Sequence, residues 1–318
     1  MGDLPITIDD VRRAAAVIDG RVRRTPVFSC ASLGAGVWLK AELLQRTGAF
    51  KVRGAFSRVA ELTGDERARG VVTCSAGNHA AAVALAGREL GTNALVMMPS
   101  YASQAKIDAT RAYGGTVDLE SADAAEAFAR MDDEAQASGR VIVHPFNDAA
   151  VMAGQGTLGL ELCAQVEGIT QVVVPVGGGG LIAGVATAVK ALAPGARVIG
   201  VEPAAIATLG PSIAAGRPLP RPAGTTIADA LAPPTIGAGP FAVLSELLDE
   251  AVTVSEAELA DGFRFLYARA KLAGEAAAAA PVAALLAGVV EPLPGTVLVL
   301  SGGNVAPDLA ARILAHEI

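Results

Sequence analysis

The chain has 318 residues, of which 52% are hydrophobic and 18% charged, and it carries a net charge of -7. This composition excludes a disordered chain, and the length is sufficient for two domains with sizeable cores. The negative charge and the lack of a basic tract argue against nucleic acid or an anionic membrane as a partner.

Further features predict a soluble, cytoplasmic protein. Residues 1–5 lack the basic and apolar regions of a signal peptide. The most apolar stretch, residues 276–290, is interrupted by Pro281, so it does not qualify as a membrane-spanning helix. The three cysteines are too few and too scattered for a disulfide framework, and the three histidines show no metal-ligand spacing. We therefore expect neither a membrane partner nor a metal site.

Apolar, strand-like runs alternate with helical patterns along most of the chain. The runs are 37–39, 71–74, 95–98, 116–119, 141–144, 172–176, 198–201 and 297–300. Such alternation indicates an α/β protein with parallel sheets. Ligands of these sheets bind outside the carboxyl ends of the strands, which is where Ser75, Gly177 and Ser301 fall.

The first segment with a chemical meaning is a turn of small residues that ends in Lys51. Apolar residues recur behind it at helical spacing: Val52, Ala55, Phe56, Val59 and Leu62. This spacing places Lys51 at the start of a helix with one buried face. The positive end of the helix dipole lowers the pKa of an amine there, which favours the neutral, nucleophilic form. A solvated surface lysine is the alternative.

Two loops that follow predicted strands can bind anions through the backbone. The first is Ser75-Ala76-Gly77-Asn78-His79, which precedes a helix; Ser75 as a plain helix N-cap is the alternative. The second is Gly177-Gly178-Gly179-Gly180, whose backbone can wrap round a phosphate. A nucleophilic lysine, an anion loop and a phosphate cradle together indicate a phosphorylated aldehyde cofactor.

These segments resemble the fold-type II pyridoxal-phosphate enzymes, specifically the threonine/serine dehydratase and serine racemase group. The matching pieces occur in family order: Gln45 to Ala55, Ser75 to His79, Ala153 to Thr157, Gly177 to Gly180, and Leu300 to Asn304. The resemblance implies two parallel-sheet α/β domains of the tryptophan synthase beta-like fold. A small domain of residues 69–147 would be inserted into a large cofactor-binding domain of residues 1–68 and 148–318. A homodimer is also implied.

The resemblance further implies a role for each matching residue. Lys51 would hold pyridoxal 5'-phosphate as a Schiff base and serve as the catalytic base, with Phe50 against the cofactor ring. Gly177 to Gly180 would hold the phosphate, Asn78 the 3-hydroxyl, and Ser301 the pyridine nitrogen. The substrate carboxylate site would consist of Ser75, Ala76, Asn78 and His79.

A neutral hydroxyl such as that of Ser301 cannot keep the pyridine nitrogen protonated, which favours β-elimination. The implied reaction is the dehydration and deamination of a hydroxy amino acid, such as L-threonine or L-serine, to a 2-oxo acid and ammonia. Serine racemase and 3-hydroxyaspartate dehydratase are alternatives within the family. Racemases of this group carry a serine where this chain has Ala76, and an alanine cannot transfer a proton.

Two interpretations lie outside this chemistry. Gly178, Gly180 and Ala183 fit a relaxed G-x-G-x-x-G/A pattern, and Glu202 lies about 20 residues further on, as a dinucleotide-dependent dehydrogenase requires. That interpretation leaves Lys51 unexplained. A catalytically inactive small-molecule sensor on the same fold is the third class.

For two carboxylate residues, Glu202 and Glu275, the sequence allows more than one role. Racemase relatives use a glutamate in the position of Glu202 as a metal ligand, together with an aspartate six residues later, where this chain has Thr208. We therefore expect no tight magnesium site. Glu275 matches a family glutamate near the cofactor, or is a solvated helix end.

Overall fold

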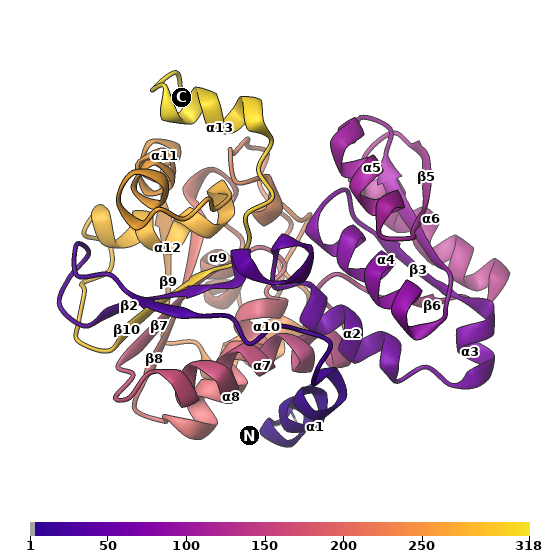
Figure 1. The fold of residues 1–318 in the computed structure, drawn as a ribbon, viewed down its shortest axis with the longest axis horizontal. Helices are drawn as coiled ribbons and strands as arrows, with labels where there is room; N and C mark the ends of the chain where they lie inside the picture. Colours follow the sequence, from indigo (N-terminus) through magenta and orange to yellow (C-terminus); the bar gives the residue numbers. More distant parts are fainter. Residues whose placement is uncertain (1–3) are drawn as a thin grey trace.

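The computed structural model describes residues 4–318, which form two α/β lobes side by side (Figure 1). The large lobe contains a six-stranded sheet of order β1-β2-β10-β7-β8-β9, and the small lobe a four-stranded sheet of order β5-β4-β3-β6. We define the small lobe as residues 71–142, from the start of β3 to the end of β6, and the large lobe as the other described residues.

The large sheet joins segments from both halves of the chain. Its strands are β1 Val27–Ser29, β2 Val37–Ala41, β7 Gln171–Pro175, β8 Arg197–Pro203, β9 Glu250–Val254 and β10 Thr296–Leu300. All neighbours pair in parallel except β1 and β2, which are antiparallel. The sequence missed β1 and β9, because these edge strands are only partly buried and lack a continuous apolar run.

The small sheet is parallel throughout. Its strands are β3 Val71–Cys74, β4 Ala94–Pro99, β5 Thr116–Ser121 and β6 Val141–Ile142, and its helices are α4 Asn78–Leu90, α5 Gln104–Ala112 and α6 Ala124–Ser138. β6 ends before His144, contrary to the sequence prediction, since the His144 ring accepts the N–H groups of Phe146 and Asn147 and closes a turn.

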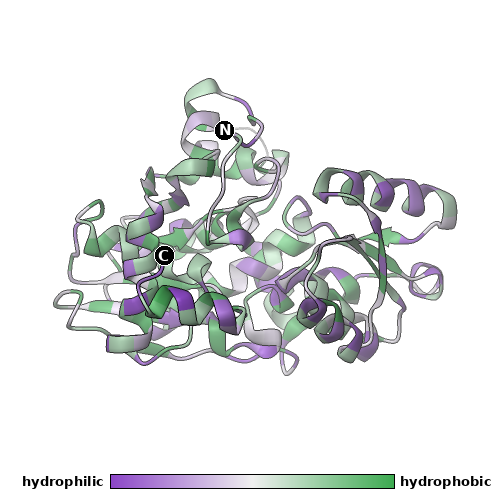
Figure 2. Cartoon of the chain, turned by 90° about the horizontal axis from the view of Figure 1, so that it is seen from above, coloured by the Kyte–Doolittle hydropathy of each residue, from purple (hydrophilic) through white to green (hydrophobic). Residues whose placement is uncertain are grey.

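The other helices lie outside residues 71–142. They are α1 Ile8–Ile18, α2 Val52–Ala60, α3 Gly64–Arg69, α7 Ala149–Gln165, α8 Gly180–Leu192, α9 Leu209–Ala215, α10 Ala238–Leu247, α11 Glu256–Phe265, α12 Ala276–Leu286 and α13 Pro307–Leu314. α3 lies beside the small lobe (Figure 1), where Arg69 Nε donates to the carbonyl oxygen of Gly139 at 2.8 Å. α8 and α12 are buried along most of their length, whereas α6 of the small lobe buries only Ala127 and Met131. Figure 2 accordingly shows hydrophobic residues through the centre of the large lobe and many hydrophilic ones on the outer helices of the small lobe.

The direction of α2 is set by its crossing with α7. A Cβ atom on Gly154 would lie 2.6 Å from the Cα atom of Gly54 and 2.7 Å from the carbonyl oxygen of Arg53. The two backbones therefore touch, which only glycine permits at this point. Because Lys51 is the N-cap residue of α2, this crossing also aims the lysine.

Candidate active site

Lys51 lies where the two lobes meet. The N–H of Phe50 before it donates to the carbonyl oxygen of Ser301 at 3.1 Å, which ties the lysine to the end of β10. The Lys51 Nζ atom donates to the carbonyl oxygen of Pro145, just beyond the small lobe, at 2.7 Å. It also lies 5.2 Å from the centre of the Phe50 ring. The predicted helix start and its buried apolar face are confirmed.

The surroundings of Lys51 favour its neutral form. Burial lowers the pKa of Lys51 to about 8, although the nearby carboxyl group of Glu275 acts in the opposite direction. The sequence argument had the correct direction, but burial rather than the helix dipole is the main cause. Burial also lowers the pKa of His79 to about 3 and that of His144 to about 4, so both rings are neutral near pH 7.

The loop after β3 forms an open helix N-terminus. The Ser75 hydroxyl accepts the N–H of Gly77 at 3.1 Å, and Gly77, not Ser75, is the N-cap of α4. Ser75 and Ala76 are half-buried. The His79 ring is buried, with Nε2 2.9 Å from the carbonyl oxygen of Val143. The other ring nitrogen, Nδ1, is buried without a hydrogen-bond partner in the described part of the chain, and the backbone N–H of His79 lies in the first turn of α4.

The glycine loop connects β7 to α8. Gly179 has a φ of +86° and is the N-cap of α8, whose first helical bond runs from Ala183 to Gly179 at 2.9 Å. The N–H groups of the first turn thus point toward a potential anion. A Cβ atom on Gly178 would collide with the Phe146 ring, and one on Gly180 would lie 3.0 Å from the Phe146 backbone. The glycines therefore also make room for Phe146.

A group of polar side chains surrounds the end of β10. Ser301 is buried there, beside Gly302. Asn78 donates through Nδ2 to Oε1 of Glu275 at 2.9 Å and accepts through Oδ1 from Asn304 at 2.8 Å. Glu275 is the N-cap residue of α12 and only 7% exposed, so it is not a solvated helix end. Sequence reasoning assigned no role to Asn304, although it closes the matching segment Leu300 to Asn304.

The Glu202 carboxylate caps the start of α9. Its carboxylate accepts the N–H groups of Thr208 and Leu209 at 2.8 and 2.9 Å, and the Thr208 hydroxyl at 3.1 Å. Both oxygens face the positive N-terminus of α9. Among residues 4–318, no group of three or more His, Cys, Asp or Glu side chains is arranged to hold a metal ion.

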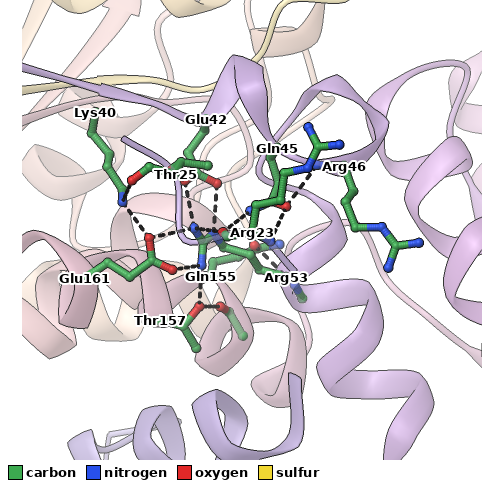
Figure 3. A network of polar contacts seen from close by, with 12 residues as sticks. Arg23, Thr25, Lys40, Glu42, Gln45, Arg46, Arg53, Gln155, Thr157 and Glu161 are labelled. Atoms are coloured by element: carbon green, nitrogen blue, oxygen red, sulfur yellow. Dashed lines mark hydrogen bonds and ion pairs between the residues drawn. The ribbon is translucent and has the colours of Figure 1, made fainter. Parts of the chain in front are cut away.

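A buried charge network, which the sequence did not predict, anchors the helix behind Lys51 (Figure 3). Arg53 contacts Glu42 at 2.8 Å and Glu161 at 2.7 Å, and Lys40 contacts Glu161 at 2.5 Å. Burial alone would raise the pKa of Glu42, but Arg53 outweighs it and holds the pKa below its usual value. Two cations and two carboxylates balance, so α2, α7 and β2 are joined without net charge.

These groups fit pyridoxal phosphate. The fit rests on an amine whose pKa is lowered by burial, a glycine cradle at a helix N-terminus, and an aromatic ring next to the amine. The chain belongs to the family of pyridoxal-phosphate dependent enzymes, whose profile matches residues 18–302. The predicted fold class and cofactor are thereby confirmed.

Individual relatives show which members of the family this chain is similar to. The chain is 41% identical to an L-threonine ammonia-lyase of Thermotoga maritima over 97% of its own length and 78% of the relative's. It matches the crystal structure of a threonine deaminase from T.th. with a TM-score of 0.89 and 40% identity, over 95% of this chain and 99% of that one. Maize serine racemase matches with a TM-score of 0.91 and 34% identity, over 98% of each chain.

The surface of the large lobe has a hollow of about 480 Å³ between α9 and α10. None of the site residues described above lines it. None of the helices within the described residues is both long and apolar enough to cross a membrane.

Proposed function

We propose that this protein is a threonine/serine ammonia-lyase, which converts a hydroxy amino acid such as L-threonine or L-serine to a 2-oxo acid and ammonia. The observation that carries the proposal is the Lys51 amine with its lowered pKa, close to Phe50 and to the end of β10. The threonine deaminase and ammonia-lyase names of the relatives at 40% and 41% identity support this choice of reaction.

The chain's own groups have distinct tasks. Pyridoxal phosphate, when bound, withdraws electrons from the α-carbon of the substrate and so acidifies the α-proton. Lys51 removes that proton as general base, which requires its neutral form. At pH 7.5 a pKa of about 8 leaves roughly a quarter of the amine neutral, against about one part in a thousand at the ordinary value of 10.5.

The remaining residues bind and orient the substrate and the cofactor. Ser75 and the backbone N–H of His79 hold the substrate carboxylate at the N-terminus of α4. Asn78 would donate to the ring oxygen of the cofactor. Gly177 to Gly180 would hold the cofactor phosphate, and Phe50 would pack against its ring. The Ser301 hydroxyl would be the partner of the pyridine nitrogen, and a neutral partner there favours loss of the β-hydroxyl.

Racemisation is the competing reaction, and maize serine racemase is among the structural relatives. A racemase needs a second proton donor on the face of the substrate opposite the lysine. Ala76, at the position where racemases carry a serine, has no proton to give. This difference supports elimination as the main reaction.

The test is a panel of L-threonine, L-serine and 3-hydroxyaspartate, assayed for ammonia and 2-oxo acid. We expect a yellow protein, a borohydride-trapped adduct on Lys51, and turnover of at least one substrate. Lys51→Ala should lose both the adduct and the activity, whereas Lys190→Ala, on α8 outside the site, should keep both. A colourless protein that binds a nicotinamide dinucleotide would overturn the proposal.

We further propose that the protein acts in the cytoplasm as a homodimer. Cys30, Cys74 and Cys163 are unpaired thiols, as expected in a reducing compartment. Cell fractionation tests the location, and light scattering on the purified protein tests the dimer.

A further inference from the structure

Three side chains from distant segments form one hydrogen-bonded group, which we call the amide clasp: Asn78, Glu275 and Asn304. Asn78 begins α4 of the small lobe, whereas Glu275 precedes α12 and Asn304 follows β10 in the large lobe. Asn304 Nδ2 donates to Asn78 Oδ1 at 2.8 Å, and Asn78 Nδ2 donates to Glu275 Oε1 at 2.9 Å. The clasp therefore links the two lobes.

The backbone sets the direction of both amides. Asn304 Nδ2 also donates to the carbonyl oxygen of Thr47 at 2.7 Å, and a carbonyl oxygen can only accept. The nitrogen of Asn304 must therefore face Thr47, and it then meets the oxygen of Asn78. The nitrogen of Asn78 is consequently turned toward the carboxyl group of Glu275. One of its two hydrogens is used there, and the other is available to a ligand.

Two glycines next to the site make room for the clasp. Gly48 has a φ of +74°, and a Cβ atom there would collide with the Asn304 side chain. A Cβ atom on Gly302 would lie 2.5 Å from Oε1 of Glu275 and 3.2 Å from Nδ2 of Asn78. Thr47 itself has a φ of +60°, which is unfavourable for a β-branched residue. The turn before Lys51 and the loop after Ser301 are thus shaped around these three side chains.

We propose that Asn304 and Glu275 are positioning residues that hold the amide nitrogen of Asn78 toward the ring oxygen of the cofactor. The inference rests on the proposed function, in which Asn78 binds that oxygen. An N–H donor facing the oxygen stabilises its anionic form, whereas an acceptor would stabilise the protonated form. The clasp thereby selects between the two tautomers of the bound cofactor, one absorbing in the visible and the other in the near ultraviolet.

The experiment compares absorption spectra of the holoenzyme and its variants at one pH. Asn304→Ala should lower the ratio of visible to near-ultraviolet absorbance by roughly fivefold, the factor that corresponds to one hydrogen bond. Gly302→Ala perturbs the clasp from the side of Glu275 and should shift the ratio in the same direction. Asn93→Ala, which removes a side chain bonded to Arg140 outside the clasp, should leave the spectrum unchanged.

A double-mutant cycle tests whether Asn304 acts through Asn78. The variant with both Asn78→Ala and Asn304→Ala should have the spectrum of Asn78→Ala alone. Effects that add, or an Asn304→Ala spectrum equal to that of the wild type, would overturn the inference. Failure of the wild type to form a borohydride-trapped adduct on Lys51 would instead overturn the proposed function, so the two failures are distinguishable.

Discussion

Two opposing influences act on the pKa of Lys51. Burial removes water from the amine and favours its neutral form, whereas the carboxyl group of Glu275 favours the charged form. The pKa of Glu275 is itself raised to about 7, mainly by burial. Near neutral pH both groups are therefore close to their midpoints, and modest changes around either one alter the supply of neutral amine.

The rate at which cofactor-free protein captures pyridoxal phosphate should follow the neutral fraction of Lys51. We expect the rate to rise with pH around a midpoint near 8, because the neutral amine increases as pH passes the lowered pKa. Glu275→Gln should move the midpoint to lower pH, since it removes the charge that raises the pKa of Lys51. Stopped-flow absorbance measures the capture. A midpoint near 10.5, the ordinary value for lysine, would contradict the prediction.

Ala76 predicts the stereochemical outcome with L-serine. Wild-type protein should release pyruvate with only traces of D-serine, because in the proposed site Ala76 supplies no proton donor on the face opposite Lys51. General acids and bases contribute about 10² to 10⁴ in rate, so Ala76→Ser should raise D-serine formation at least about tenfold if its hydroxyl reaches the α-carbon. Chiral chromatography measures the product, and Ala76→Gly, which adds no donor, is the matched control. D-serine formed by wild type as fast as pyruvate would make the protein a racemase.

Residues that belong to a recognisable local pattern could be predicted from the sequence. Lys51 followed from the helical pattern behind it, and the glycine loop from the strand before it. The contacts that complete the site join distant positions: Arg53 and Glu161 lie 108 residues apart, and Asn78 and Glu275 lie 197 apart. No local pattern reveals such pairs, because only the tertiary fold brings them together.

At the level of elements, the carboxylate of Glu202 stabilises the start of α9. Glu202 stands at the end of β8 and accepts the first N–H groups of the helix, which supplies the negative charge that a helix N-terminus favours. A cation in the same place would be repelled by the partial positive charge of those N–H groups. The helix thus fixes the chain that follows β8 by hydrogen bonds alone.

Chelation should consequently leave the melting temperature and activity of the wild type nearly unchanged. Removing the charge with Glu202→Gln should lower the free energy of unfolding by about 1–2 kcal/mol, as for other lost caps. Glu246→Gln, at an exposed position of α10 away from the site, should have almost no effect. Urea titration gives the free energies. Loss of stability on chelation that magnesium restores would show that a metal site exists after all.

At the scale of the molecule, charged side chains also join the two lobes. Arg46 pairs with Glu89 of α4, and Lys106 of α5 contacts Asp229 of the short helix η4, Asp229–Leu231, at 2.7 Å. The side chains of Lys106 and Asp229 are 37% and 69% exposed. Such an exposed pair adds little to stability, but it favours arrangements in which the lobes are close.

Lys106→Ala should raise KM for the amino acid about two- to fivefold, which corresponds to at most about 1 kcal/mol, with an unchanged melting temperature. High salt should reproduce the effect in the wild type and add nothing to the variant. Steady-state kinetics at two ionic strengths measures both. The exchanged pair Lys106→Asp with Asp229→Lys should regain the wild-type KM. An increase in KM that salt does not mimic would rule out an electrostatic contact as the cause.

The central position of β10 determines when the large sheet can form during synthesis on the ribosome. β10 pairs with β2 on one side and β7 on the other, so the two halves of the large sheet cannot join until residues 296–300 have emerged. The nascent chain therefore carries Lys51 for most of its translation without the strand that completes its surroundings. Cofactor loading becomes a late event, and chains stalled before residue 296 should not turn yellow with pyridoxal phosphate, whereas the released protein should. A premature aldehyde adduct on such stalled chains would show that the lysine is competent before the sheet closes.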